Sequence, residues 1–351
     1  MRKYLLPKEG KFYKANLHAH STQSDGRQTP EELKARYKEN GYSIFALSDH
    51  DFLRYNGDLS DEDFLMLTAY EISVRDYDSQ TPGAIRKIVD LNFFAKNPDN
   101  RTLIGYHPDT VQWLVNRGKI SQQTVDNAIY SGGLRELHYS PSIVNSIIRC
   151  ANENGYLVSI NHPTWSLINY SDYSQYEGAW AVEVFNNHCA VDGLGDSEHV
   201  FEEMLRLGKP IFATATDDNH FLHETLGGFT MIKAEKLEYN SVISAMEKGN
   251  FYASTGPEIY DLYYEDGNVY IECSPAKKIS MLTIGRHRGA RIAEPGATVT
   301  NAVFKVTPDQ HGYVRFRVTD CEGNNAWTNA YYVDEMDENA QVLRVLPPDE
   351  H

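Results

Sequence analysis

The first part of the chain, to about residue 250, alternates short apolar runs with amphipathic stretches, and this alternation constrains the fold most. Strands that alternate with helices wind into an α/β domain, where ligands bind at the carboxyl ends of the strands. Residues 29–40 are typical of the helices, with Thr29 as N-cap, Glu32 three residues later and Gly41 after the end. The same pattern predicts helices over 142–154 and 197–207, and strands over 43–48, 157–160, 181–185 and 210–215.

The alternation breaks in two places. Within a domain spanning 1–255, residues 95–140 include the helical stretch QWLVNRG and the Gly-rich SGGLREL, and we expect an inserted lid or pocket wall there. Over 256–338, runs such as NVYIECS, YVRFRV and NAYYV are separated by turns such as EDGN, which predicts a small all-β sandwich domain. We expect the sandwich to buttress the α/β domain or to form a homodimer, and residues 339–351 to be an acidic tail.

Charge and cysteine content exclude several classes of protein. The formal net charge of -16 argues against a nucleic-acid polymer as partner, because binding phosphate polymers needs clustered Lys and Arg. The four cysteines are far apart and form no CxxC pair, so we expect ordinary core thiols: Cys150, Cys189, Cys273 and Cys321. No apolar run has the length of a signal peptide or a membrane span, which predicts a cytoplasmic protein without a membrane partner.

Histidines and carboxylates follow the predicted strands at spacings that bring them together. His18 and His20 are two residues apart, so at a strand end both rings point into the same space. Asp25 follows in a turn before Gly26, and the next strand ends in Asp49-His50-Asp51. Because buried carboxylates and imidazoles without partners are costly, such a cluster is hard to explain as packing alone.

Further candidate ligands repeat this pattern along the chain. Glu71 follows the apolar run LMLTAY, His162 follows a strand in Asn-His-Pro, and residues 217–220 follow another as Asp-Asp-Asn-His. Mixed imidazole and carboxylate ligands suit Zn, Mn or Fe, whereas an all-oxygen set favours Mg or Ca. We therefore expect two or three divalent metal ions, with their identity open among these three.

The motifs HAHSTQSDG, SDHD, a strand-end Glu, NHP and DxH, in this order, resemble those of the PHP (polymerase and histidinol phosphatase) family over about residues 13–255. The resemblance implies a distorted (β/α)7 barrel and a metal-dependent phosphoesterase. It also implies that His18 and His20 bind one metal with Asp218. Asp25 and His50 would bind a second with His220, and Glu71 would bridge to a third site served by His162. Asp217 competes with Asp218, which we prefer because its DxH spacing places both side chains on one face of an extended end.

Two features bear on how far the resemblance extends. Asp90, in DLNFF, stands where many relatives have a His, so either Asp90 is itself a ligand or the site is binuclear. The stretches GGFTMIKA and GNFYASTGP, which lead into the sandwich, resemble the branch of PHP-like proteins grouped with carbaryl hydrolase. That branch is functionally diverse.

The leading hypothesis is a phosphoesterase that cleaves a small organic phosphate, a mono- or diester, by a metal-bridged hydroxide. The alternatives are an amide or carbamate hydrolase and a catalytically silent module that only binds metal or ligand. For proton transfer the candidates are His188, His223 and Asp51. For binding the phosphate, the candidates in the insertion are His107, His138, Arg101 and Arg135.

Overall fold

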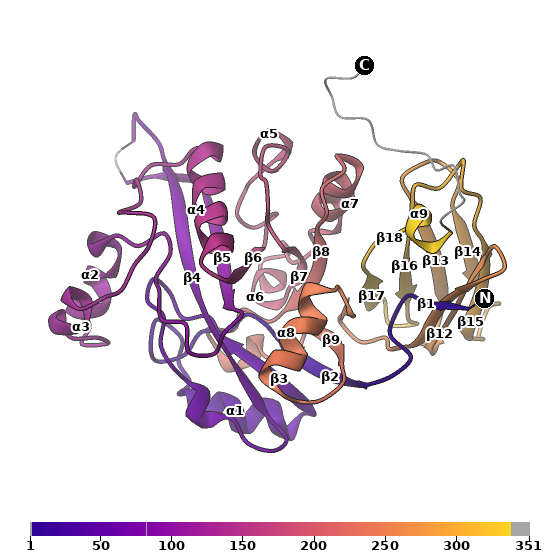
Figure 1. Ribbon diagram of the computed structural model, residues 1–351, viewed down its shortest axis with the longest axis horizontal. Coiled ribbons are helices and arrows are strands. Elements are labelled where there is room, and N and C mark those ends of the chain that lie inside the picture. The colour runs from indigo at the N-terminus through magenta and orange to yellow at the C-terminus, as the bar shows by residue number, and fades with distance from the viewer. Residues whose placement is uncertain (1, 82, 338–351) are drawn as a thin grey trace.

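A long mixed β-sheet carries helices on both sides and continues into the C-terminal strands (Figure 1). The computed structural model describes residues 2–81 and 83–337. Neighbouring strands in the first part of the sheet follow chain order: β2 (Lys11–Asn16), β3 (Tyr42–Leu47), β4 (Leu65–Tyr77), β5 (Ile85–Ala95), β6 (Tyr156–Ile160), β7 (Ala181–Asn186) and β8 (Phe212–Thr216). An isolated bridge between Ala19 and Asn219 joins the segments that follow β2 and β8, the first and last strands of this series.

Strand direction decides where the site lies. Strands β2, β3 and β4 are parallel to one another, as are β6, β7 and β8, and β5 is antiparallel to both of its neighbours. The parallel strands therefore present their carboxyl ends at one edge, where ligands bind in sheets of this class.

The predicted helices and strands of this part are confirmed to within about two residues of their predicted ends. Helix α1 (Pro30–Glu39) has the predicted capping box, in which Thr29 accepts from the Glu32 amide and the Glu32 carboxylate accepts from the Thr29 amide. The other helices that cover the sheet are α4 (Pro141–Glu153), α7 (Glu198–Arg206) and α8 (Tyr239–Glu247).

The prediction that a strand ends at Glu71 is wrong. Strand β4 continues to Tyr77 because it pairs with β5 in a long antiparallel hairpin, with Glu71 opposite Asn92 and Ser73 opposite Asp90. Alternate residues of β4 point to the same face, so Glu71 and Ser73 are followed on that face by Arg75. The hairpin thus extends beyond Glu71 and forms a wall of the site.

The segment between β5 and α4 forms a lobe at the end of the molecule opposite the C-terminal strands (Figure 1). It contains α2 (Pro108–Asn116) and α3 (Gln122–Asp126), and α2 includes part of the predicted helical stretch. Shorter elements elsewhere in the α/β part are η1 (Gly57–Leu59), α5 (Tyr170–Tyr173), α6 (Asn187–Val191) and η2 (Leu222–Glu224).

The C-terminal strands lie in two sheets. The long sheet continues through β9 (Phe229–Ala234), β10 (Phe251–Ser254), β17 (Asn325–Thr328), β16 (Tyr313–Thr319), β13 (Lys278–Thr283) and β14 (Gly289–Ile292), and β18 (Tyr331–Tyr332) pairs with β16. The second sheet contains β1 (Lys3–Tyr4), β11 (Ile259–Glu265), β12 (Asn268–Ala276) and β15 (Val299–Lys305). Side chains of both sheets, such as Ile271 and Phe316, belong to one buried hydrophobic cluster.

The C-terminal end departs from prediction in one detail. The run NAYYV is only partly a strand, since β18 is followed at once by the helical turn α9 (Val333–Met336). The predicted acidic tail, 339–351, lies outside the described residues.

The four cysteines are unpaired. Cys189 and Cys273 are buried, as core thiols should be, whereas Cys150 is half-buried and Cys321 is exposed. Among the described helices, none combines the length and the apolar character that crossing a membrane requires.

Candidate metal centre

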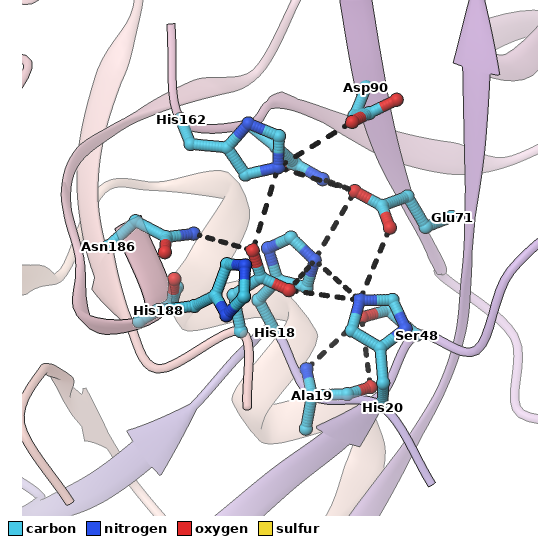
Figure 2. A network of polar contacts seen from close by, with 12 residues as sticks. His18, Ala19, His20, Ser48, Glu71, Asp90, His162, Asn186 and His188 are labelled. Carbon is cyan, nitrogen blue, oxygen red and sulfur yellow. Dashed lines mark hydrogen bonds and ion pairs between the residues drawn. The ribbon is translucent and has the colours of Figure 1, made fainter. Parts of the chain in front are cut away.

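The two histidines that follow β2 point toward each other at the carboxyl edge of the sheet. Their Nε2 atoms are 3.2 Å apart, and both side chains are fully buried. The backbone holds this geometry, because the Asp218 amide donates to the His18 carbonyl and the His20 amide donates to the Asn219 carbonyl. The segments after β2 and β8 are thereby fixed against each other, and His18 and His20 meet the carboxylates of the neighbouring strands (Figure 2).

Every predicted metal ligand lies in a group whose donor atoms are within 4.8 Å of one another. Four of these groups are His20, Asp25, His50 and His220; His18, His162 and Asp218; His18, His20 and Glu71; and Glu71, Asp90 and His162, and a fifth is His188, His220 and Glu224. Because His18, His20, Glu71 and His162 each occur in two groups, the groups form one continuous cluster. His20 faces two directions, with Nε2 3.0 Å from Asp218 Oδ1 and Nδ1 3.8 Å from Asp25 Oδ1.

Geometry separates the two adjacent aspartates. The Asp217 carboxylate accepts hydrogen bonds from the Tyr37 hydroxyl and from the backbone amides of the turn 226–228. Asp218, at a positive φ of 52°, instead points Oδ1 at His18 and His20, at 3.1 and 3.0 Å. Asp217 therefore holds the turn, and Asp218 faces the cluster.

Asp90 also faces the cluster. Its Oδ2 lies 3.7 Å from His162 Nε2, and Oε1 of the Glu71 carboxylate approaches the same nitrogen at 3.8 Å. Burial raises the pKa of Asp90 well above its ordinary value, and the nearby Glu71 carboxylate raises it further. Two buried carboxylates this close favour a bound cation between them.

Buried polar atoms without partners provide a test of whether a metal fits. Among the described residues, His20 Nδ1 and Asp90 Oδ1 are buried without a hydrogen bond, and so is Asp218 Oδ1, although two imidazole nitrogens lie 3.0 and 3.1 Å away. Buried polar atoms are nearly always hydrogen-bonded, so three such atoms in one cluster need an explanation. Imidazole nitrogens and carboxylate oxygens are the ligands of Zn, Mn and Fe, and the donor set fits these metals.

Glu183, in the middle of β7, was not predicted. Its carboxylate accepts from His18 Nδ1 at 2.8 Å, from the Thr216 hydroxyl at 2.7 Å and from the His162 amide at 2.8 Å. A carboxylate that holds one ring nitrogen of a ligand histidine orients the other toward the metal. The signal in the sequence is an acidic residue in the apolar run AVEVF, since such a residue needs buried partners.

Other polar contacts hold the remaining ligands in place. The His162 Nδ1 lies 2.9 Å from the Ser166 hydroxyl, which leaves Nε2 directed at the carboxylates. Asn161 donates to Glu71 Oε1 at 2.6 Å. Asp49 accepts from the amide of Ser21 and from two serine hydroxyls, so it fixes the loop that presents Asp25.

A cavity of about 180 Å³ opens onto the cluster, and His188 lines it. His188 Nδ1 lies 3.0 Å from Glu224 Oε1, and its ring centre is 4.8 Å from that of His220. Burial lowers the pKa of His220 to about 4, and repulsion from His20 adds to this effect, which keeps the His220 imidazole neutral. His223 is directed elsewhere, with a side chain 67% exposed that stacks on Phe221.

A second cavity, of about 270 Å³, adjoins the first and shares Ser73 and Arg75 with it. Asp51 lines this second cavity rather than the cluster, because its positive φ of 64° turns it away from His50 and Trp113 Nε1 donates to it at 2.9 Å. Arg135, from the predicted insertion, lines the same cavity. Arg75 was not predicted.

The other residues proposed for phosphate binding line neither cavity. Arg101 donates to the carbonyls of Pro98 and Asn100. His107 caps helix α2 by accepting from the Asp109 amide. His138 is 70% exposed and lies 3.3 Å from Glu136.

Comparison with known proteins identifies neighbours by structure only. No family model matches the sequence, and no curated protein matches it. Among solved structures, one similar in fold is a two-domain protein from Bacteroides vulgatus that contains a predicted PHP-like metal-dependent phosphoesterase. It has 14% identity and a TM-score of 0.45, over 94% of this chain and 98% of that chain.

Two further structures resemble part of the chain. A proposed metal-dependent phosphoesterase from Bifidobacterium adolescentis has 16% identity and a TM-score of 0.34, over 61% of this chain and 89% of that chain. An amidohydrolase from Chromobacterium violaceum has 18% identity and a TM-score of 0.37, over 60% of this chain and 88% of that chain.

Proposed function

We propose that this protein is a metal-dependent phosphoesterase, a phosphoric ester hydrolase that acts on a small organic phosphate. The observation that carries the proposal is the cluster of imidazoles and carboxylates at the carboxyl edge of the sheet. Within each of its groups the donor atoms lie within 4.8 Å of one another, and three buried atoms of the cluster make no hydrogen bond with the residues that the structure describes. In this proposal, strands β2 to β8 form a distorted (β/α)7 barrel and the two C-terminal sheets form a sandwich domain.

The proposed ligands divide into an outer and an inner part. His20, Asp25, His50 and His220 would hold one divalent ion, and His18, His162 and Asp218 a second, with Glu71 between them. Asp90 completes a third group with Glu71 and His162, so two or three ions of Zn, Mn or Fe fit. When bound, such ions lower the pKa of a coordinated water and offset the negative charge of a phosphate.

Residues of the chain supply the rest of the chemistry. Arg75, at the junction of the two cavities, is placed to hold a non-bridging oxygen of the phosphate. His188 lines the cavity at the cluster, with Nδ1 3.0 Å from Glu224 Oε1, so its ring can deliver a proton to the leaving oxygen.

Metal content and turnover measured on one preparation test the proposal. We expect two or three equivalents of Zn, Mn or Fe per chain by mass spectrometry, and hydrolysis of at least one compound in a panel of aryl phosphates, sugar phosphates and nucleotides. Aryl carbamates and anilides belong in the same panel. Turnover of only these would instead favour an amide or carbamate hydrolase, and less than one metal per chain would contradict the proposal.

A further inference from the structure

Two arginines and three acidic residues line the second cavity; the acidic ones are Asp51, Asp109 and Glu136. Arg75 and Arg135 both line it, and within the described part of the chain neither guanidinium has a carboxylate within 4.0 Å. Nη1 of Arg135 is buried and lacks a hydrogen-bond partner there. In a chain of net charge -16, two unpaired guanidinium groups beside one cavity indicate that an anion binds between them.

The acidic residues of the wall are engaged elsewhere. The Asp109 and Glu136 side chains are 78% and 68% exposed and lie beside His107 and His138. Asp51 accepts a hydrogen bond from Trp113 Nε1 at 2.9 Å, so its carboxylate fixes the indole of α2 against the cavity. The cavity therefore keeps its attraction for an external anion.

Part of the remaining wall is apolar, beside the polar residues Ser73, Thr110, Asp109 and Glu136. Val74 is buried in β4, the Trp113 ring is held by Asp51, and Leu137 of the insertion closes another side. An aromatic ring set in this way offers a flat surface for an apolar body. The cavity thus offers two kinds of contact, a flat apolar one and an anionic one.

We propose that this cavity binds the leaving group of the substrate, and that Arg135 recognises a second anionic group on it. The inference rests on the proposed phosphoesterase function, because the first anion is the phosphate at the metal cluster and the shared residues Ser73 and Arg75 connect the two cavities. The substrate class is then an organic phosphate with a flat apolar body and a second negative charge, either a carboxylate or another phosphate.

Binding of matched arylphosphonates to the metal-loaded protein tests this inference without turnover. The pair is 4-carboxyphenylphosphonate and its neutral isostere 4-carbamoylphenylphosphonate, titrated by calorimetry. We expect the wild type to prefer the carboxylate by about 10- to 100-fold, the range that a charge-assisted hydrogen bond gives. Benzene-1,4-diphosphonate, run alongside, decides between a carboxylate and a phosphate as the second anion.

Two arginines of the same insertion provide a matched pair of variants. Arg135→Gln should reduce the preference to about 2-fold or less, because the charge that recognises the anion is gone. Arg101→Gln should keep the preference, since that side chain binds the carbonyls of Pro98 and Asn100 outside the cavity. If Arg135→Gln does not fold, Arg135→Lys replaces it and should weaken the preference through loss of the planar fork.

Equal binding of the carboxyphenyl and carbamoylphenyl phosphonates by the wild type would overturn the inference. So would a preference that survives in both arginine variants. The proposed function can fail independently. If the wild type prefers the carboxyphenyl phosphonate but the same preparation hydrolyses no phosphate, the cavity is an anion site and the protein is not a phosphoesterase.

Discussion

At the scale of single residues, adjacent aspartates have different tasks, and this difference can be measured. Asp218→Asn should remove at least one metal equivalent per chain, because Asp218 Oδ1 faces both His18 and His20. Asp217→Asn should keep the metal but lower the free energy of unfolding by about 1–3 kcal/mol, since Asp217 accepts from Tyr37 and from the turn 226–228. Metal analysis and urea unfolding of both variants check this, and metal loss in Asp217→Asn alone would reverse the assignment.

Glu183 makes a second residue-scale prediction. Replacing it with Gln should weaken metal affinity by about 10- to 100-fold, because the contact that orients His18 Nδ1 loses its charge. Competition with a chromophoric chelator measures the affinity. The exposed Glu177→Gln, whose carboxylate pairs with Lys209, serves as the control and should leave the affinity unchanged.

At the scale of elements, the β4–β5 hairpin separates site-facing from outward-facing arginines. Arg75 lines both cavities, whereas Arg86 pairs with Asp76 at 2.9 Å on the exposed part of the hairpin. Arg75→Met should lower kcat/KM for phosphorylated substrates by about 10- to 100-fold through loss of a charge-assisted hydrogen bond. Arg86→Met should change kcat/KM by less than about 2-fold, since exposed ion pairs contribute little. Similar effects of both substitutions would show that Arg75 does not touch the substrate.

The same hairpin contains features that the sequence predicts and features that it does not predict. Local signals, such as the Thr29 capping box and the two-residue spacing of His18 and His20, predict helix ends and shared side-chain direction, because both depend on neighbours along the chain. The length of β4 depends instead on pairing with β5, and the place of Glu183 depends on rings from other strands. Such long-range contacts leave only weak traces in one sequence, so Arg75 and Glu183 became visible only in the structure.

At the scale of the whole molecule, a buried ion network connects the C-terminal strands to the α/β part. Arg315 of β16 is 1% exposed and donates to Glu202 and Glu198 of α7, at 2.6 and 2.9 Å. Arg317 donates to the same Glu198 at 2.6 Å. Because α7 packs on β7, which carries Glu183, this network joins the C-terminal sheets to the elements that support the metal cluster.

Removing Arg315 should destabilise the protein in a pH-dependent way. Burial alone would raise the pKa of Glu198, but Arg315 and Arg317 hold it below its ordinary value of 4.5. A lowered pKa in the folded state means that this carboxylate stabilises the wild type above pH 4.5, and the contribution is lost as the pH falls below that value.

Arg315→Met leaves two buried carboxylates with less counter-charge, so we expect the free energy of unfolding to fall by about 3–5 kcal/mol at pH 7. At pH 4 the difference between variant and wild type should shrink, because in the variant Glu198 is no longer held by Arg315 and can take up a proton. Urea unfolding at both pH values measures this, and a difference that does not change with pH would mean that Arg315 stabilises through packing rather than charge.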